Sequence, residues 1–332
     1  MNSPDTARIS ALLTSYWRGA VIHAAVKVGL FEALDQGNVT FETLTEMTGC
    51  VPHLILSVLH CLERMKLVKA NGDSWELTED GKLLTKSSSV NLVSSARMWW
   101  REHLDAWRNL DHTLRTGESY FEALYGKSFF EWLENRDEAR QLYHESMREY
   151  AKIDYVKVPE IINRYKPRHL IDIGGGTGIL CEMILELNPE MKAYLLDKPS
   201  VIEEAEKVLK RSKHYTRLKF LKGDFFHLPE GDYDAVVLSR VLHDWGDKDC
   251  LEILRGIQGL LSRDGHLFII ERAPNTLKEV SLVNLDLAVI TRGVERTYHE
   301  FYELLSRTRF EIIDSVDLLN GQKVIIARFS GA

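Results

Sequence analysis

The sequence predicts an α/β fold with a mostly parallel, doubly wound sheet in its C-terminal half. From residue 168 onward, apolar runs of strand length alternate with helical patterns, as a parallel sheet requires. A glycine-rich turn, Gly174–Gly178, follows the first of these runs and precedes a helix. The last two apolar runs flank Asn320-Gly321, which is typical of a hairpin, so we expect the final strand to enter the sheet antiparallel.

The first 34 residues predict helices with a wide apolar stripe. Apolar residues recur at helical spacing over 9–34, and we expect Gly19 and Gly29 to divide this stretch into two or three helices. A stripe this wide needs more than one partner. It indicates either ordinary core or a dimer interface.

The next elements predict a winged-helix domain. Thr40 and Gly49 mark the start and end of one helix, a second spans 53–67 after Pro52, and the turn Asn71-Gly72-Asp73 indicates a hairpin. The second helix, which would enter a DNA groove, is mostly apolar, with its basic residues near its C-terminal end. We therefore expect the domain to serve packing and dimerisation instead of DNA binding.

Residues 90–150 predict a helical, aromatic-rich segment with loops at Gly117, Gly126 and Ser128. Its aromatic side chains form either core or, because the segment joins two domains, part of the wall of a ligand cleft. The expected domains are 1–90 (winged-helix dimerisation), 91–155 (helical linker lining a substrate pocket) and 156–332 (ligand-binding catalytic domain).

The C-terminal part predicts a sheet built from five strands and a closing hairpin. The strands are expected at 169–173, 192–196, 218–222, 233–239 and 266–272, with Gly265 as the turn before the fifth, and the hairpin at 310–318 and 323–329. The helices are expected at about 178–187, 200–211, 247–261, 279–291 and 297–308.

Charge and cysteine content narrow the class of protein. A net charge of −7 argues against a nucleic-acid partner and against an anionic membrane surface. The four cysteines are scattered without a CxxC pair, and the N-terminus lacks a signal-peptide profile. These features favour a cytoplasmic protein with reduced cysteines.

Ligands of such sheets bind at the carboxyl ends of the strands, where this sequence places distinctive residues. At Gly174, which has no Cβ, a ligand can lie directly against the backbone. Asp197 ends the second strand and can accept hydrogen bonds from two ribose hydroxyls. Asp224 and Phe225 follow the third strand. The Asp224 carboxylate can accept a hydrogen bond from an adenine amino group, and the aromatic ring of Phe225 can cover the adenine. The fourth ends in Ser239-Arg240, followed by His243.

The strand ends also discriminate between nucleotides. The glycine turn reads GxGxG, and an NAD-dependent dehydrogenase would share it together with the acidic residue after the second strand. Asp224 after the third strand and the C-terminal antiparallel hairpin favour S-adenosylmethionine over NAD. No His/Cys/Asp cluster has the spacing of a metal site, so no metal is expected.

Five motifs in order carry a family resemblance. The runs 170–178, 197–202, 223–226, 241–247 and 295–297 resemble those of the S-adenosylmethionine-dependent O-methyltransferases of the caffeic acid and acetylserotonin type, with bacterial relatives that tailor small aromatic molecules. The resemblance covers nearly the whole chain. It implies a class I methyltransferase sheet, a homodimer formed through the N-terminal domain, and a phenolic or polyketide-like acceptor.

The resemblance also implies roles for individual residues. The residues that would bind S-adenosylmethionine are Gly174, Asp197, Asp224, Phe225, Ser239, Arg240 and Tyr150. His243 would be the general base, with Glu271 and Glu295 as candidates to orient it. The acceptor pocket would include Met147, Trp99 and Asp286.

Three positions depart from the family pattern. The usual Asp-Leu-Pro is Asp197-Lys198-Pro199, which keeps the ribose carboxylate. Ser239 stands where many plant members have lysine, so this predicted cofactor contact departs from the family pattern. The usual Ala-Gly-Phe before the last hairpin is Arg307–Phe310, which affects a turn and not the site.

Histidine suits the implied chemistry. A phenol has a pKa of about 10, so little is ionised at neutral pH, whereas an imidazole with a pKa of about 6.5 can accept its proton as the new bond forms. A carboxylate on the other ring nitrogen fixes the tautomer and stabilises the imidazolium. Glu271 or Glu295 would instead be structural if paired with Arg272 or Arg296, and Asp244 could simply cap the following helix.

Two further hypotheses stay open on the sequence alone. Some relatives use the same bound S-adenosylmethionine for decarboxylation, hydroxylation or pericyclic chemistry; the intact His243 with two nearby acidic candidates disfavours this. A nucleotide-sensing winged-helix regulator is disfavoured by the acidic charge and the apolar second helix.

Overall fold

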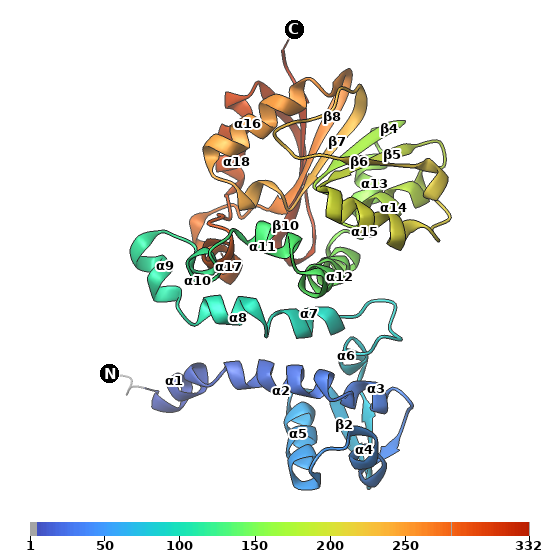
Figure 1. Ribbon diagram of the computed structural model, residues 1–332, viewed down its shortest axis with the longest axis vertical. Helices are drawn as coiled ribbons and strands as arrows, with labels where there is room; N and C mark the ends of the chain where they lie inside the picture. Colours follow the sequence, from blue (N-terminus) through green and yellow to red (C-terminus); the bar gives the residue numbers. More distant parts are fainter. Residues whose placement is uncertain (1–4, 280, 332) are drawn as a thin grey trace. The chain divides into compact units, whose positions relative to one another are not determined.

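A computed structural model of the chain describes residues 5–279 and 281–331 (Figure 1). The chain divides into two compact units. One comprises the residues up to Leu104 with Gln141–Glu149, and the other Asp105–Arg140 with the residues from Tyr150 onward. The segment 91–155, expected as one linker, contributes residues to both units. Among the described residues, no helix is long and apolar enough to cross a membrane.

The first unit contains short helices and a three-stranded sheet of order β1-β3-β2. Its elements are α1 (Thr6–Leu13), α2 (Tyr16–Lys27), α3 (Leu30–Leu34), β1 (Val39–Thr40), α4 (Phe41–Thr48), α5 (Pro52–Arg64), β2 (Val68–Asn71), β3 (Ser74–Leu77), α6 (Glu79–Lys82) and α7 (Val93–Met98). The order helix, helix, hairpin agrees with the prediction, and the winged-helix assignment itself stays a prediction.

Local chemistry explains where these elements begin and end. The Thr40 hydroxyl accepts the Thr43 N–H at 3.2 Å, and Gly49 ends α4 with φ at +62°, both as expected. Gly19 does not divide two helices, contrary to expectation, because it lies inside α2. A Cβ there would lie 3.1 Å from the Trp100 ring, so the glycine admits the indole of Trp100, which lies in the turn after α7.

The second unit contains the large sheet and the helices around it. Its elements before the sheet are α9 (Leu110–Thr116), α10 (Tyr120–Tyr125), α11 (Phe129–Glu134) and α13 (Val158–Asn163), while α8 (Glu102–Trp107) and α12 (Asp137–Asp154) have residues in both units. The sheet and its connections are β4 (His169–Ile173), α14 (Ile179–Leu187), β5 (Lys192–Asp197), α15 (Pro199–Leu209), β6 (Leu218–Lys222), β7 (Tyr233–Ser239), α16 (Asp247–Gln258), β8 (Leu261–Arg272), α17 (Leu282–Ile290), α18 (Tyr298–Arg307), β9 (Phe310–Asp317) and β10 (Gln322–Phe329).

The sheet has seven strands in the order β6-β5-β4-β7-β8-β10-β9. The first five pair in parallel, and β10 pairs antiparallel with both β8 and β9, which confirms the expected closing hairpin. Asn320 and Gly321 both have positive φ in the turn, as a tight hairpin requires. Strand β4 is central, so its carboxyl end and those of β5 and β7 meet at one edge.

Strand β8 begins earlier than expected. Gly265 was expected as a turn before the strand, and it lies inside β8 instead. The register shifts there, because Tyr233 pairs with Leu261 while Ala235 pairs with His266. A Cβ at Gly265 would lie 2.8 Å from the Tyr233 carbonyl oxygen, so glycine permits the close approach of the two strands at this irregularity.

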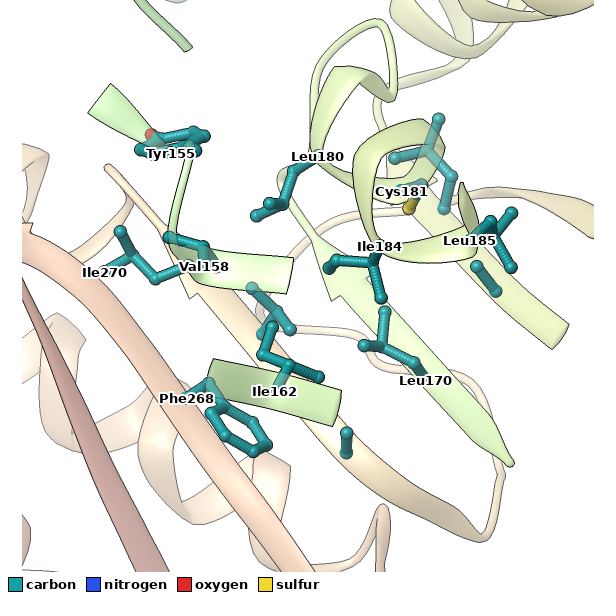
Figure 2. Packing of buried hydrophobic residues seen from close by; sticks show 14 of the residues in the cluster. Tyr155, Val158, Ile162, Leu170, Leu180, Cys181, Ile184, Leu185, Phe268 and Ile270 are labelled. Carbon is teal, nitrogen blue, oxygen red and sulfur yellow. The ribbon is translucent and has the colours of Figure 1, made fainter. Parts of the chain in front are cut away.

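Two apolar cores cover the two faces of the sheet. On one face α13, α14 and α15 pack on the strands, and on the other α16 and α18 do so. Figure 2 shows the first core, where Leu180 and Ile184 of α14 lie over Leu170 of β4, beside Val158 and Ile162 of α13. Burial on both faces makes these strands almost continuously apolar and holds their carboxyl ends in fixed positions.

Candidate functional site

The glycine turn after β4 exposes bare backbone. Gly174 has φ of +73° and Gly176 of +59°, a region that side chains disfavour. A Cβ at Gly174 would lie 2.8 Å from a Phe225 ring carbon and 2.9 Å from Val241 Cγ2. The turn is therefore a cradle that any side chain would fill, which fits a ligand lying directly on the main chain.

Replacing Gly174 with alanine is expected to weaken S-adenosylmethionine binding about tenfold or more. The left-handed conformation costs a residue with a Cβ about 1–2 kcal/mol, and the Cβ also displaces Phe225 or Val241. Calorimetric titration measures the affinity. Gly259→Ala is the matched control, because Gly259 has φ of −76° and its Cβ would meet nothing nearer than 3.7 Å. Equal affinities of the two variants would contradict the cradle.

Asp197 lies at the end of β5, beside the glycine turn. Its Oδ2 accepts the Gly176 N–H at 2.9 Å and its Oδ1 accepts the Lys198 N–H at 2.7 Å. Burial raises the pKa of Asp197, and the two backbone donors oppose that rise. The carboxylate is therefore oriented by the turn itself, and its remaining lone pairs can accept hydrogen bonds from a ligand.

Asp172 is a neighbouring residue that the sequence reasoning missed. It is buried within β4, and a Cβ at Gly175 would lie 2.4 Å from its Oδ2, which places the carboxyl directly beneath the turn. Burial raises its pKa to about 7, while the Cys181 thiol, 3.6 Å from Oδ2, opposes this. Its Oδ1 has no hydrogen-bond partner among the described residues. The available signal was an acidic residue in the middle of an otherwise apolar strand.

Asp224 and Phe225 follow β6. Asp224 accepts the backbone N–H groups of Phe226 at 2.8 Å and His227 at 2.9 Å. Burial works against its charge, but the His227 ring and these donors hold the pKa of Asp224 below its usual value. The Phe225 ring lies against the Gly174 backbone and 5.8 Å from the Trp245 ring. A half-exposed carboxylate thus lies beside an aromatic surface that borders the glycine turn.

Ser239 and Arg240, at the end of β7, contact the residues at and after the end of α12. The Ser239 hydroxyl donates to the Tyr155 hydroxyl at 2.6 Å. Arg240, which has φ of +55°, donates to Asp154, and its guanidinium lies 5.2 Å from the Tyr155 ring centre. Asn320 also donates to Asp154, at 2.7 Å. These bonds fix the loop between Ser239 and His243, and contact with a cofactor stays a prediction for both residues.

The structure brings His243 and Glu271 together. His243 Nδ1 lies 2.6 Å from Glu271 Oε2, and Glu271 is fully buried at the end of β8. The other carboxylate oxygen accepts the backbone N–H groups of Val241 at 2.9 Å and His243 at 3.4 Å. Glu271 therefore orients both the ring and the loop that carries it.

Charge around His243 favours its protonated form. Burial works against that charge, yet the carboxylates of Glu271 and Asp244 raise the pKa of His243 to about 9. Asp244 Oδ2 lies 3.6 Å from Nε2, and burial raises the pKa of Asp244 while His243 and the Thr291 hydroxyl oppose that rise. Nδ1 is thus held by Glu271, and Nε2 is the nitrogen left to exchange a proton with a ligand.

Glu295 is placed differently from the expectation that it orients His243. Its carboxylate accepts hydrogen bonds from the Arg272 guanidinium, from the Ser281 N–H at 2.8 Å and from the Ser281 hydroxyl at 3.1 Å. The preceding residue, Val294, donates its N–H to the His243 carbonyl at 2.8 Å, whereas the Glu295 side chain makes no hydrogen bond to His243 among the described residues. These hydrogen bonds match the alternative prediction for Glu295, a structural pair with an arginine.

The remaining predicted residues fall in different units. Trp99 and Met147 belong to the first unit, where Trp99 is 38% exposed and its ring meets the His103 ring edge-on at 4.9 Å. Tyr150 and Asp286 belong to the second unit, and both are half-buried. The Trp107 indole donates to Asp286 at 2.5 Å. The roles of these four residues in ligand binding stay predictions.

The sheet order and the site at its carboxyl edge define the class of protein. Seven strands with an antiparallel closing hairpin, a glycine turn after β4 and acidic residues after β5 and β6 are the features of a class I methyltransferase. The chain belongs to the O-methyltransferase family, whose domain matches residues 107–311. The predicted class, an S-adenosylmethionine-dependent O-methyltransferase, is thereby confirmed.

Individual relatives agree with this assignment. The 3-amino-4-hydroxybenzoate 4-O-methyltransferase of Streptomyces cremeus is 32% identical over 326 residues, covering 96% of this chain and 88% of the relative. The structure of mitomycin 7-O-methyltransferase MmcR superposes with a TM-score of 0.86 at 28% identity, covering 98% of this chain and 97% of that one. Human N-acetylserotonin methyltransferase, solved with S-adenosylmethionine, shares the fold, with a TM-score of 0.89 at 24% identity and 99% coverage of both chains.

Proposed function

We propose that this enzyme methylates a phenolic hydroxyl of a small aromatic acceptor, with His243 as the general base. The observation that carries the proposal is the 2.6 Å contact between His243 Nδ1 and the buried Glu271. That contact commits Nδ1 to the carboxylate. It leaves Nε2 to take the proton of the acceptor hydroxyl.

The residues at the carboxyl edge of the sheet fit the cofactor. When bound, S-adenosylmethionine supplies an activated methyl group on a positively charged sulfur. Gly174 and Gly176 offer bare backbone for its amino-acid end, and the Asp197 carboxylate can accept both ribose hydroxyls. Asp224 can accept the adenine amino group, with Phe225 against the ring. Tyr150, Ser239 and Arg240 are proposed as further contacts.

The chain's own residues would perform the proton transfer and the positioning. Holding the acceptor oxygen in line with the methyl group is an orientation task, which rigid strand ends serve well. As Nε2 takes the phenolic proton, the imidazolium charge develops between Glu271 and Asp244. Because both carboxylates favour that charge, they stabilise the transition state relative to the neutral ring. Asp286 is proposed to line the acceptor pocket.

Relatives support an aromatic acceptor. The Streptomyces cremeus relative is named for methylating the 4-oxygen of an aromatic hydroxy acid, and another relative, 30% identical, is named for 6-O-methylation in mitomycin biosynthesis. One relative at 25% identity is a phenazine-1-carboxylate N-methyltransferase. The assay must therefore establish which atom receives the methyl group.

A product assay tests the proposed function. The enzyme is incubated with S-adenosylmethionine and a panel of phenols, naphthols and hydroxyquinones, and the products are identified by mass spectrometry and NMR. We expect equal amounts of S-adenosylhomocysteine and of an O-methylated product that is heavier by one CH₂. A transformed acceptor without S-adenosylhomocysteine would point to non-methylating chemistry, and methylation at nitrogen alone would contradict the proposed acceptor atom.

Replacing Asp197 with alanine is expected to raise the Kd for S-adenosylmethionine about tenfold or more. The change removes an oriented carboxylate, and a hydrogen bond to a charged group contributes about 1.5–3 kcal/mol. Asp234→Ala is the matched control, because that carboxylate also accepts two backbone N–H groups, from Arg168 and His169, at the opposite end of the sheet. A Kd changed equally by both variants would refute a direct role for Asp197.

We also propose that the N-terminal domain forms a homodimer. Large apolar side chains of α1 and α2 are exposed, including Leu12 (57%), Leu13 (73%) and Trp17 (58%). Exposed apolar side chains gathered on adjacent elements are typical of an interaction surface. Light scattering should give twice the chain mass, and Leu13→Glu with Trp17→Glu should shift the mass to that of a monomer. A monomeric wild-type protein would rule the homodimer out.

A further inference from the structure

Asp286 is a carboxylate that the proposed mechanism does not use. It lies on α17 and is half-buried, and its Oδ1 accepts the Trp107 indole N–H at 2.5 Å. Asp286 is also close enough to His243 and Asp244 to interact with both electrostatically. A third acidic side chain, besides Glu271 and Asp244, therefore lies near the His243 ring.

The position of Asp286 is fixed relative to His243 by the turn that follows α17. The Val294 N–H donates to the His243 carbonyl at 2.8 Å, and a Cβ at Gly293 would lie 2.2 Å from the same oxygen. The Thr291 hydroxyl donates to the Leu287 carbonyl at 3.1 Å and favours the charged form of Asp244. The turn after α17 is thus held on the segment that carries the histidine, and the Gly293 N–H donates to the carbonyl of Leu287, the residue next to Asp286, at 3.1 Å.

Trp107 binds only one of the two carboxylate oxygens of Asp286. The indole binds Oδ1, and Oδ2 accepts no hydrogen bond from the residues that the structure describes. Burial raises the pKa of Asp286 to about 6, with Trp107 opposing this and Asp244 adding to it, so the group is mostly ionised at pH 7.5. Because no donor among the described residues occupies Oδ2, a ligand that brings a hydroxyl or amino donor can bind there in place of solvent.

We infer that Asp286 selects acceptors that carry a hydroxyl or amino group on the ring carbon next to the methylated hydroxyl. The inference rests on the proposed function. The methylated oxygen meets Nε2 of His243, and a donor on the adjacent ring carbon lies nearest to that oxygen, so one ring can serve both residues. Trp107 orients the carboxylate for this contact. Asp286 is thus a specificity-determining residue and Trp107 a positioning residue.

Four neutral naphthalenes with the same 2-hydroxynaphthalene skeleton test the inference. Two carry a donor beside the hydroxyl (2,3-dihydroxynaphthalene and 3-amino-2-naphthol), one carries hydrogen there (2-naphthol), and one carries only an acceptor (3-methoxy-2-naphthol). The measurement is kcat/KM for methyl transfer by the full-length enzyme with saturating S-adenosylmethionine. We expect the wild type to favour the two donor compounds about 10-fold to 100-fold, the range given by one hydrogen bond to a charged group.

Two variants test whether Asp286 and Trp107 cause the preference for donor compounds. Asp286→Asn keeps the size and the bond from Trp107 but presents an amide donor in place of Oδ2, so the preference should fall to about onefold. Trp107→Phe keeps the ring but frees the carboxylate, so the preference should weaken without vanishing. Asp105→Asn is the matched control, because Asp105 is a half-buried acid on the same helix whose partners are Tyr125 and Arg108. It should retain the full preference.

Calorimetric titration with S-adenosylhomocysteine shows that each variant is folded and binds cofactor. Three results would overturn the inference while the proposed function stands. The wild type could lack the preference for donor compounds, or the Asp286→Asn variant could keep it. The wild type could also methylate other phenols but none of these donor compounds. Failure of the wild type to O-methylate any phenol would remove the proposed function itself, which the product assay detects separately.

Discussion

Replacing His243 with alanine is expected to lower kcat by about 10²–10⁴-fold, the usual contribution of a general base. Nε2 is the ring nitrogen that Glu271 leaves available, so the phenol would lose the group that accepts its proton. The residues proposed to hold S-adenosylmethionine lie at other strand ends, so its Kd should change by less than about threefold. Single-turnover kinetics and calorimetry measure the two quantities.

The His243→Ala variant also leaves Glu271 buried without its partner. Removing one partner of a buried pair costs about 3–5 kcal/mol, so a thermal melt must show that the variant is folded at the assay temperature. His243→Gln gives a second test, because its amide can still donate to Glu271. It should lose turnover to the same extent while melting closer to the wild type. His299→Ala, at an exposed histidine on α18, serves as the control. Turnover retained by both His243 variants would exclude this residue as the base.

Replacing Glu271 with glutamine is expected to lower kcat about 100-fold or more. One oxygen of Glu271 accepts two backbone N–H groups and the other holds Nδ1. A glutamine that keeps its oxygen on the backbone donors turns its NH₂ toward Nδ1. The neutral ring then carries its proton mostly on Nε2, so only a minor fraction of it can act as a base. The variant has nearly the same shape, so a melt close to that of the wild type separates this effect from unfolding.

Glu295→Gln is the matched control for Glu271→Gln. Glu295 is also a buried glutamate that accepts a backbone N–H, but its partners are Arg272 and Ser281. Its replacement should lower the melting temperature and leave the pH dependence of kcat unchanged. A loss of turnover that is as large for Glu295→Gln as for Glu271→Gln would contradict the pairing seen here.

The sequence predicted the elements whose local signals are strong. The parallel strands from β4 to β7 begin and end close to the predicted residues because Asp197, Asp224 and the glycine turn interrupt the apolar runs. The hairpin at Asn320-Gly321 followed from turn chemistry alone. Gly19 and Gly265 misled the prediction because each was interpreted as a break. Both instead allow a close approach, to Trp100 and to Tyr233, by residues that no local pattern reveals.

In the candidate site, too, the features with a local sequence signal were predictable and those set by long-range contacts were not. Residues that follow strand ends were predictable, since parallel strands bring their carboxyl ends to one edge. The choice between Glu271 and Glu295 could not be predicted, because both are buried glutamates. Only the register of β8 directs Glu271 toward His243. The contact between Trp107 and Asp286 joins residues 179 positions apart and leaves no trace in sequence spacing.

The pH dependence of kcat in the wild type and in Glu271→Gln, measured with one acceptor, tests the central claim most directly. Glu271 raises the pKa of His243, so the neutral ring that acts as a base forms only at higher pH. Turnover should therefore rise about tenfold per pH unit above neutrality and then level off. The acceptor's own ionisation is common to both enzymes. We predict that the plateau begins at lower pH in Glu271→Gln, with a smaller maximal rate. A plateau that begins at the same pH in both enzymes would contradict the assignment of His243 and Glu271 as the catalytic pair.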